Sequence, residues 1–175
     1  MIVVHFTKSL RSKLRLDEVS AVSIDTGPHL RWYANLFRAE RVQYILTTNA
    51  ASLYSVVMYG RGITDSDLYL KHFLTALREQ LEAADMQMMY KRCIAPHTGT
   101  VALAKAQDRS VLGSMNDMVN PYKYRLEMGS ASPWDLSEAI NSTPFGAIGY
   151  RYPVEAFAQL PVVSAEHIVK NGHHQ

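Results

Sequence analysis

Residues 31–48 read RWYANLFRAERVQYILTT, and this stretch carries the strongest β-strand signal in the chain. We expect two strands, over residues 31–37 and 42–48, joined by a short connection at residues 38–41. The second strand places Val42, Tyr44 and Leu46 on one face and Gln43, Ile45 and Thr47 on the other, because side chains alternate along a strand. The stretch therefore predicts an antiparallel hairpin.

A third strand and a covering helix follow the hairpin. Asn49-Ala50-Ala51 predicts a turn and residues 53–59 a strand, which completes an antiparallel meander. Such a sheet is stable only when a helix covers one of its faces. Thr64-Asp65-Ser66-Asp67 is typical of a helix start, and the apolar spacing beyond it predicts an amphipathic helix over residues 67–84. The apolar positions are Leu68, Phe73, Leu74, Leu77 and Leu81.

Shorter elements are predicted on both sides of this unit. Residues 2–6 predict a buried strand, followed by a short helix that Thr7 would cap. Residues 100–106 predict a further strand. The pattern Ser132-Pro133-Trp134-Asp135 is typical of another helix start, since serine, proline and an acid suit the N-cap, the first and the third helical positions.

The last part of the chain predicts a loop over residues 141–149 and a short helix over residues 153–160. We therefore expect one α+β domain over residues 1–160, in which an antiparallel β-meander sheet packs against several α-helices. Residues 161–175 are expected to form a loosely held tail.

The composition is that of an ordinary globular protein. Hydrophobic residues make up 47% and charged residues 19% of the 175 residues, which excludes a largely disordered chain. The formal net charge of +2 is too small to indicate nucleic-acid binding by itself. Cys93 is the only cysteine, which excludes an internal disulfide and agrees with a reducing cytoplasm. No stretch approaches the length of a membrane span, so we expect a cytoplasmic protein with no membrane partner.

The decapeptide Asp108-Arg109-Ser110-Val111-Leu112-Gly113-Ser114-Met115-Asn116-Asp117 is the most unusual segment. Asp108 would cap a helix over residues 109–119, whose polar face carries Ser, Asn, Asp and Gly instead of the Lys and Glu that favour helices. Gly113 alone costs about 1 kcal/mol relative to alanine. Either another backbone packs closely against Gly113, or a ligand approaches this face.

Two interpretations of the polar face remain open. In the first, Arg109 and Asp117 belong to an internal polar network that ties the helix to the hairpin. In the second, the face is a ligand-binding pocket. Its candidate residues are Asp108, Arg109, Ser110, Ser114, Asn116 and Asp117, completed by Asn35 and Asn49.

Catalysis and nucleic-acid binding are the alternatives. An enzyme would use Asp117 or His97 as proton carrier, with Arg109 orienting an anionic group of a small substrate. A weak nucleic-acid site would consist of the basic residues Lys8, Arg11, Lys13 and Arg15. No histidine falls in a metal-ligand pattern and no glycine-rich phosphate loop occurs, so we expect no metal and no cofactor.

The decapeptide resembles the signature of the DUF6933 family of small bacterial domains of unknown function. Weaker similarity lies in the segments Thr7-Lys8, Trp32–Leu36, Thr48–Tyr54, Asn141–Pro144 and Tyr152-Pro153. The resemblance covers most of the chain up to about Leu160. It implies a bacterial, cytoplasmic, stand-alone α+β domain, and this kind of family points to an accessory gene on mobile DNA. It implies no activity, cofactor or catalytic residue.

Taken together, the sequence favours a non-catalytic module that binds a small ligand or a protein partner through the polar face of the helix over residues 108–120. A homodimer is one form that such a partner could take.

Overall fold

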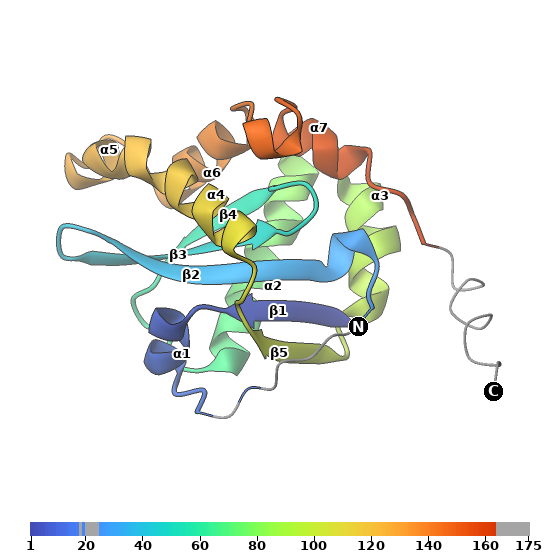
Figure 1. Ribbon diagram of the computed structural model, residues 1–175, viewed down its shortest axis with the longest axis horizontal. Helices are drawn as coiled ribbons and strands as arrows, with labels where there is room; N and C mark the ends of the chain where they lie inside the picture. Colours follow the sequence, from blue (N-terminus) through green and yellow to red (C-terminus); the bar gives the residue numbers. More distant parts are fainter. Residues whose placement is uncertain (18, 20–24, 164–175) are drawn as a thin grey trace.

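The computed structural model describes residues 1–17, 19 and 25–163. A five-stranded sheet runs through it in the order β4-β3-β2-β1-β5 (Figure 1). The strands are β1 (Ile2–Phe6), β2 (Arg31–Ala39), β3 (Val42–Asn49), β4 (Ser55–Tyr59) and β5 (Val101–Lys105). The predicted α+β class and the β2-β3-β4 meander are confirmed.

The β2-β3 hairpin is tighter than the sequence pattern predicts. Arg38 and Ala39 still belong to β2, where they pair with Gln43 and Val42, so the turn consists of Glu40 and Arg41 alone. The predicted four-residue connection is therefore wrong. The backbone of Glu40 has φ +55°, the left-handed conformation that such short hairpin turns require.

The turn between β3 and β4 is built by Asn49. Its side-chain oxygen accepts hydrogen bonds from the backbone N–H groups of Ala51 and Ser52, at 3.1 and 2.9 Å. Leu53 then has φ +61°, so β4 starts at Ser55 and not at Leu53 as predicted.

Strand β1 gives the sheet a parallel centre that the meander alone does not contain. It lies between β2 and β5 and runs parallel to both. All five residues of β1 are buried, because helices or loops cover both faces at this position. A strand buried on both faces needs no polar alternation, which explains the apolar run at the start of the chain.

Helices pack on both faces of the sheet (Figure 1). They are α1 (Lys8–Leu14), α2 (Ser66–Ala83), α3 (Gln87–Met89), α4 (Arg109–Val119), α5 (Lys123–Glu127), α6 (Pro133–Asn141) and α7 (Pro153–Ala158). Phe73 and Leu77 of α2 pack with Val4 and Trp32 in one core cluster. The helices α4, α5 and α6 pack against the opposite face in a second cluster.

Helix starts follow the sequence signals, with one exception. Asp65 caps α2 by accepting the backbone N–H of Leu68 at 2.8 Å, and Ser132 and Asp135 form a reciprocal capping box at the start of α6. Thr7 precedes α1, but its hydroxyl does not cap that helix; it donates to the side-chain oxygen of Asn35 at 2.8 Å.

The end of the chain agrees only in part with prediction. Asn141 is the last residue of α6, and a short 3-10 turn over Gly146–Ile148 interrupts the predicted loop. Most of the predicted tail, residues 164–175, lies outside the described residues.

Helix α6 lies along the outer edge of β4 and replaces a neighbouring strand. The Ser137 hydroxyl oxygen accepts the backbone N–H of Val57 at 2.8 Å. The side chain of Asn141 accepts the N–H of Ser55 at 2.8 Å and donates to its carbonyl at 2.9 Å. The pairing of these three backbone groups protects this part of the β4 edge against strand addition from another chain.

The Ser137 contact yields a stability prediction. Ser137→Ala leaves the buried N–H of Val57 without its partner, so we expect a loss of about 1 to 3 kcal/mol in the free energy of unfolding. Urea denaturation measures it, with Ser110→Ala on the exposed side of α4 as the control. Equal stability of the two variants would show that α6 does not pair the edge of β4.

Candidate functional site

Helix α4 begins and packs as the decapeptide predicts. The carboxylate of Asp108 accepts the backbone N–H groups of Ser110 and Val111, at 2.9 and 3.3 Å. Val111 and Met115 are buried against the sheet, in the cluster that also contains Tyr33. Because the Asp108 carboxylate already occupies the N-terminal end of α4, this end does not offer its amides to an anionic ligand.

The polar face of α4 points away from the protein. Arg109, Ser110, Asn116 and Asp117 are exposed, and Ser114 is half-buried. Among the described residues, the side chains of Arg109 and Asp117 form no hydrogen bond, and the single ion pair is Arg78–Glu82. The interpretation that Arg109 and Asp117 hold α4 to the hairpin through a polar network is therefore wrong for the described part of the chain.

Gly113 is also exposed, and a Cβ atom built on it meets nothing within 4 Å. The expectation that another backbone packs closely against Gly113 is wrong. The physical reason is that α4 contacts the sheet through its apolar face, which includes Val111 and Met118, and Gly113 lies on the other side.

This position gives a second prediction. Gly113→Ala adds a methyl group in open space and removes the conformational cost of glycine, so the free energy of unfolding should rise by about 0.5 to 1 kcal/mol. Thermal denaturation of the purified variant measures the change. A destabilised variant would mean that a backbone or side chain does contact Gly113 in solution.

The two predicted asparagines lie apart from α4's polar face and from each other. Asn35 pairs with Leu46 on the α4 side of the sheet and accepts a hydrogen bond from Thr7. Asn49 is fully buried opposite Trp32, on the α2 side, where it builds the β3-β4 turn. The structure therefore does not bring the predicted pocket residues into one pocket.

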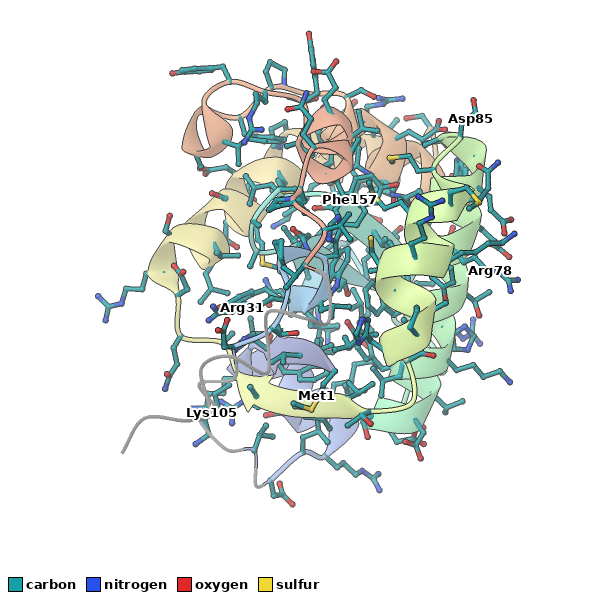
Figure 2. All side chains as sticks on the ribbon, turned by 90° about the vertical axis from the view of Figure 1, so that its right-hand side faces the viewer. Met1, Arg31, Arg78, Asp85, Lys105 and Phe157 are labelled. Atoms are coloured by element: carbon teal, nitrogen blue, oxygen red, sulfur yellow. The ribbon has the colours of Figure 1, made fainter. Side chains whose placement is uncertain are left out.

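Asp108 instead lies beside a buried cluster that sequence reasoning missed. The rings of His5 and Tyr33 stack with centroids 4.5 Å apart. The His5 Nδ1 atom lies 3.2 Å from the carbonyl of Lys105, and Nε2 accepts the Nε–H of Arg31 at 3.4 Å. Figure 2 shows Arg31 on the α4 side of the sheet, with Arg78 on the α2 side.

The surroundings of His5 and Tyr33 favour the neutral form of both side chains. Burial lowers the pKa of His5, and Arg31 lowers it further, while the Lys105 carbonyl and Asp108 act in the opposite direction. Burial likewise raises the pKa of the Tyr33 phenol. Both ring nitrogens of His5 are engaged and the residue is 5% exposed, so the imidazole offers no free atom to a substrate. A histidine inside an apolar strand gives no sequence signal that separates this role from ordinary core packing.

The catalytic residues considered from sequence are not brought together either. His97 lies at the start of the sheet, with its Nδ1 atom 3.2 Å from the amino group of Met1. Arg109 follows the opposite end of β5, since Thr100 adjoins Ile2 and Lys105 pairs with Phe6. Asp117 lies a further two turns along α4.

The basic residues after Thr7 do not form one continuous surface. Lys13 donates to the side-chain oxygen of Gln43 at 2.8 Å. Arg11 is half-buried, and its Nε atom is buried without a hydrogen-bond partner among the described residues. Lys8 and Arg15 remain exposed at the two ends of α1.

The buried histidines predict how stability depends on pH. Burial lowers the pKa of His5 and of His29 below the ordinary value of 6.5. As the pH falls through 6.5, the unfolded chain therefore takes up protons that the folded protein does not. The free energy of unfolding should be constant above about pH 7 and should fall as the pH drops below 6.5.

Urea unfolding at a series of pH values tests this, with His29→Leu as the variant, because the Nε2 atom of His29 is buried without a partner in the described residues. The variant should lose stability less steeply on acidification than the wild type, and His72→Leu on the exposed face of α2 serves as control. Identical slopes for wild type and His29→Leu would contradict the assignment.

A hollow lies elsewhere, where the C-terminal end of α2 meets α6 and α7. This cavity has a volume of about 310 Å³ and opens to solvent. Figure 1 shows these three helices converging on one side of the molecule, and Figure 2 labels Asp85 just beyond the end of α2. Its described lining residues are Tyr54, Gln80, Ala83, Ala84, Trp134, Glu138, Asn141, Ser142 and Val154.

The cavity combines fixed polar groups with aromatic surface. Gln80 and Asn141 both donate to the carbonyl of Ser55, at 2.8 and 2.9 Å, so their side chains are held in place. Tyr54 stacks on Phe157 with centroids 4.9 Å apart, and burial raises the pKa of its phenol to about 12. Trp134 is 39% exposed, an uncommon position for so large an apolar side chain.

None of the residues predicted as a site lines this cavity. One feature of the sequence could have pointed to this cavity, namely Trp134 directly after the helix start Ser132-Pro133. The spacing of residues alone, however, does not show that α2 ends beside Trp134. Within the described residues, no three His, Cys, Asp or Glu side chains are close enough to hold a metal ion. No helix in that part of the chain is both long and apolar enough to cross a bilayer.

The fold is that of an α+β domain. Comparison with known protein families identifies the family to which this domain belongs. The family model described as a domain of unknown function (DUF6933) matches residues 3–156. The chain belongs to this family, as the decapeptide predicted. No curated protein and no solved structure matches the chain.

Proposed function

We propose that this protein is a non-catalytic module that binds a small molecule in the cavity between α2, α6 and α7. The observation that carries the proposal is the cavity itself, in which Tyr54, Trp134 and Glu138 converge. Ligand pockets in proteins typically have volumes of about 300 to 1,000 Å³ and combine apolar surface with a few placed polar groups. The volume of about 310 Å³ suits a small ligand with one ring or a short chain.

The chemistry of the lining supports binding and not catalysis. Covalent or acid–base catalysis needs a nucleophile beside a base, or two titratable groups with separated pKa values. The described lining contains one carboxylate, Glu138, and no His, Cys or Lys. Tyr54 and Ser142 contribute hydroxyl groups, and neither has a basic side chain next to it in this lining.

The polar face of α4, proposed from the sequence as the binding site, is the competing location. Its side chains are exposed except for the half-buried Ser114, and a Cβ atom built on Gly113 meets nothing within 4 Å. Such a surface suits contact with another protein better than enclosure of a small molecule. Variants in the cavity and on the polar face of α4 therefore distinguish between these two locations of the binding site.

A cavity-filling variant tests the proposal. Ala84 lines the cavity and is exposed at the end of α2, so Ala84→Trp should fill the space without disturbing the core. Compounds that raise the melting temperature of the wild type should fail to do so for this variant. A ligand at 100 times its dissociation constant stabilises a protein by about 2.7 kcal/mol, which a thermal-shift screen detects.

Ala158→Trp is the matched control, since Ala158 is exposed at the end of α7 and does not line the cavity. It should bind as the wild type does. Hits that survive in Ala84→Trp but disappear in a folded Arg109→Ala variant would place the site on α4 and contradict the proposal.

A further inference from the structure

We propose that the ligand of this cavity is a small organic cation with a primary ammonium or guanidinium group. This inference rests on the proposed function and specifies its ligand. Two helices end at the cavity: Gln80, Ala83 and Ala84 belong to the last turn of α2 and its cap, and Asn141 and Ser142 to those of α6. The C-terminal end of a helix carries about half a negative charge, because its last carbonyl groups have no intrahelical partner.

Neither helix neutralises this negative end with a side chain of its own. The last turn of α2, a helix of 18 residues, contains no basic residue, and neither does the last turn of α6. Lysine, arginine or histidine in that turn is the usual way to stabilise a helix C-terminus. Backbone N–H groups of the cap residues Ala84 and Ser142 donate to the last carbonyls of α2 and α6, but no basic side chain offsets the dipole of either helix, so both ends favour a positive charge in the cavity.

Glu138 adds a full negative charge to the same space. It is the one charged residue among the described lining residues, and no Lys, Arg or His stands beside it in that set. The single ion pair among the described residues, Arg78–Glu82, does not involve it. An anionic ligand would meet this carboxylate and both negative helix ends, so the lining disfavours it.

The aromatic side chains supply the remaining contacts. A cation over the face of a tryptophan is attracted by the ring, and Trp134 is both exposed and part of the lining. Val154 offers apolar surface to the uncharged part of the ligand, whereas Tyr54, which also lines the cavity, is only 1% exposed. Because Glu138 and Ser142 present oxygen acceptors, a group with N–H donors suits the cavity better than a quaternary ammonium.

Matched pairs of probes test the charge directly. Isothermal titration calorimetry of the full chain would compare 2-phenylethylamine with 2-phenylethanol, which replaces the ammonium by a hydroxyl, and cyclohexylmethylamine with cyclohexylmethanol. We expect each amine to bind about tenfold more tightly than its alcohol, because hydrogen bonds to charged groups are the stronger ones. Added salt should weaken the amines selectively.

Glu138→Gln should reduce this preference, because only the two helix ends and Trp134 then favour the positive charge, and should leave the alcohol's affinity unchanged. The matched control is Glu155→Gln, since Glu155 is an exposed residue of α7 that does not line the cavity. It should keep the wild-type preference. Both side chains are exposed, so the melting temperatures of the free variants should match that of the wild type.

The outcomes separate the two proposals. Equal binding of amine and alcohol, lost for both in Ala84→Trp, would overturn the cationic ligand and leave the binding module intact. Tighter binding of 3-phenylpropionate than of the amine would overturn it as well. No binding of any probe to the wild type would contradict both the ligand class and the proposed function.

Discussion

The rest of the structure depends on how the outer edge of β4 is paired. A sheet edge exposes a row of backbone N–H and C=O groups, and burying them unpaired is costly. Here Asn141 pairs both backbone groups of Ser55, and Ser137, four residues earlier on α6, pairs the N–H of Val57. This requirement fixes the position and the rotation of α6 relative to the sheet.

The same rotation determines which side chains face the cavity. With Ser137 and Asn141 directed at β4, the adjacent stripe of Trp134, Glu138 and Ser142, spaced by four residues, faces the end of α2. Asn141 contributes both to the pairing of the β4 edge and to the wall of the cavity, since it pairs with Ser55 and also lines the cavity. The cavity is therefore a consequence of closing the sheet edge with a helix, and its walls are held by hydrogen bonds to the backbone of the sheet.

Local patterns predicted much of the fold and little of the site. The alternation in residues 42–48, the Asp65 cap and the Ser132-Pro133 start depend on neighbours in sequence, so the bounds of β3 and α2 and the start of α6 were predicted nearly to the residue. The parallel pairing of β1 with β2 and β5 depends on partners far apart in the sequence, such as His5 and Ala104, and no local pattern encodes it. The unusual residues of α4 drew attention to an exposed face, whereas the cavity is formed by ordinary residues at the ends of separate helices. Whether the polar face of α4 binds a partner stays a prediction.

The most direct test of this account is an NMR titration of the isotope-labelled protein with 2-phenylethylamine. The account predicts progressive shifts in the indole N–H of Trp134, the side-chain amide of Asn141 and the backbone amides of Ala83 and Ala84, all of which surround the cavity. Signals of Arg109, Asn116 and Asp117 on α4 should stay unchanged. Shifts confined to α4, with Trp134 unaffected, would contradict the account and return the binding site to the polar face of that helix.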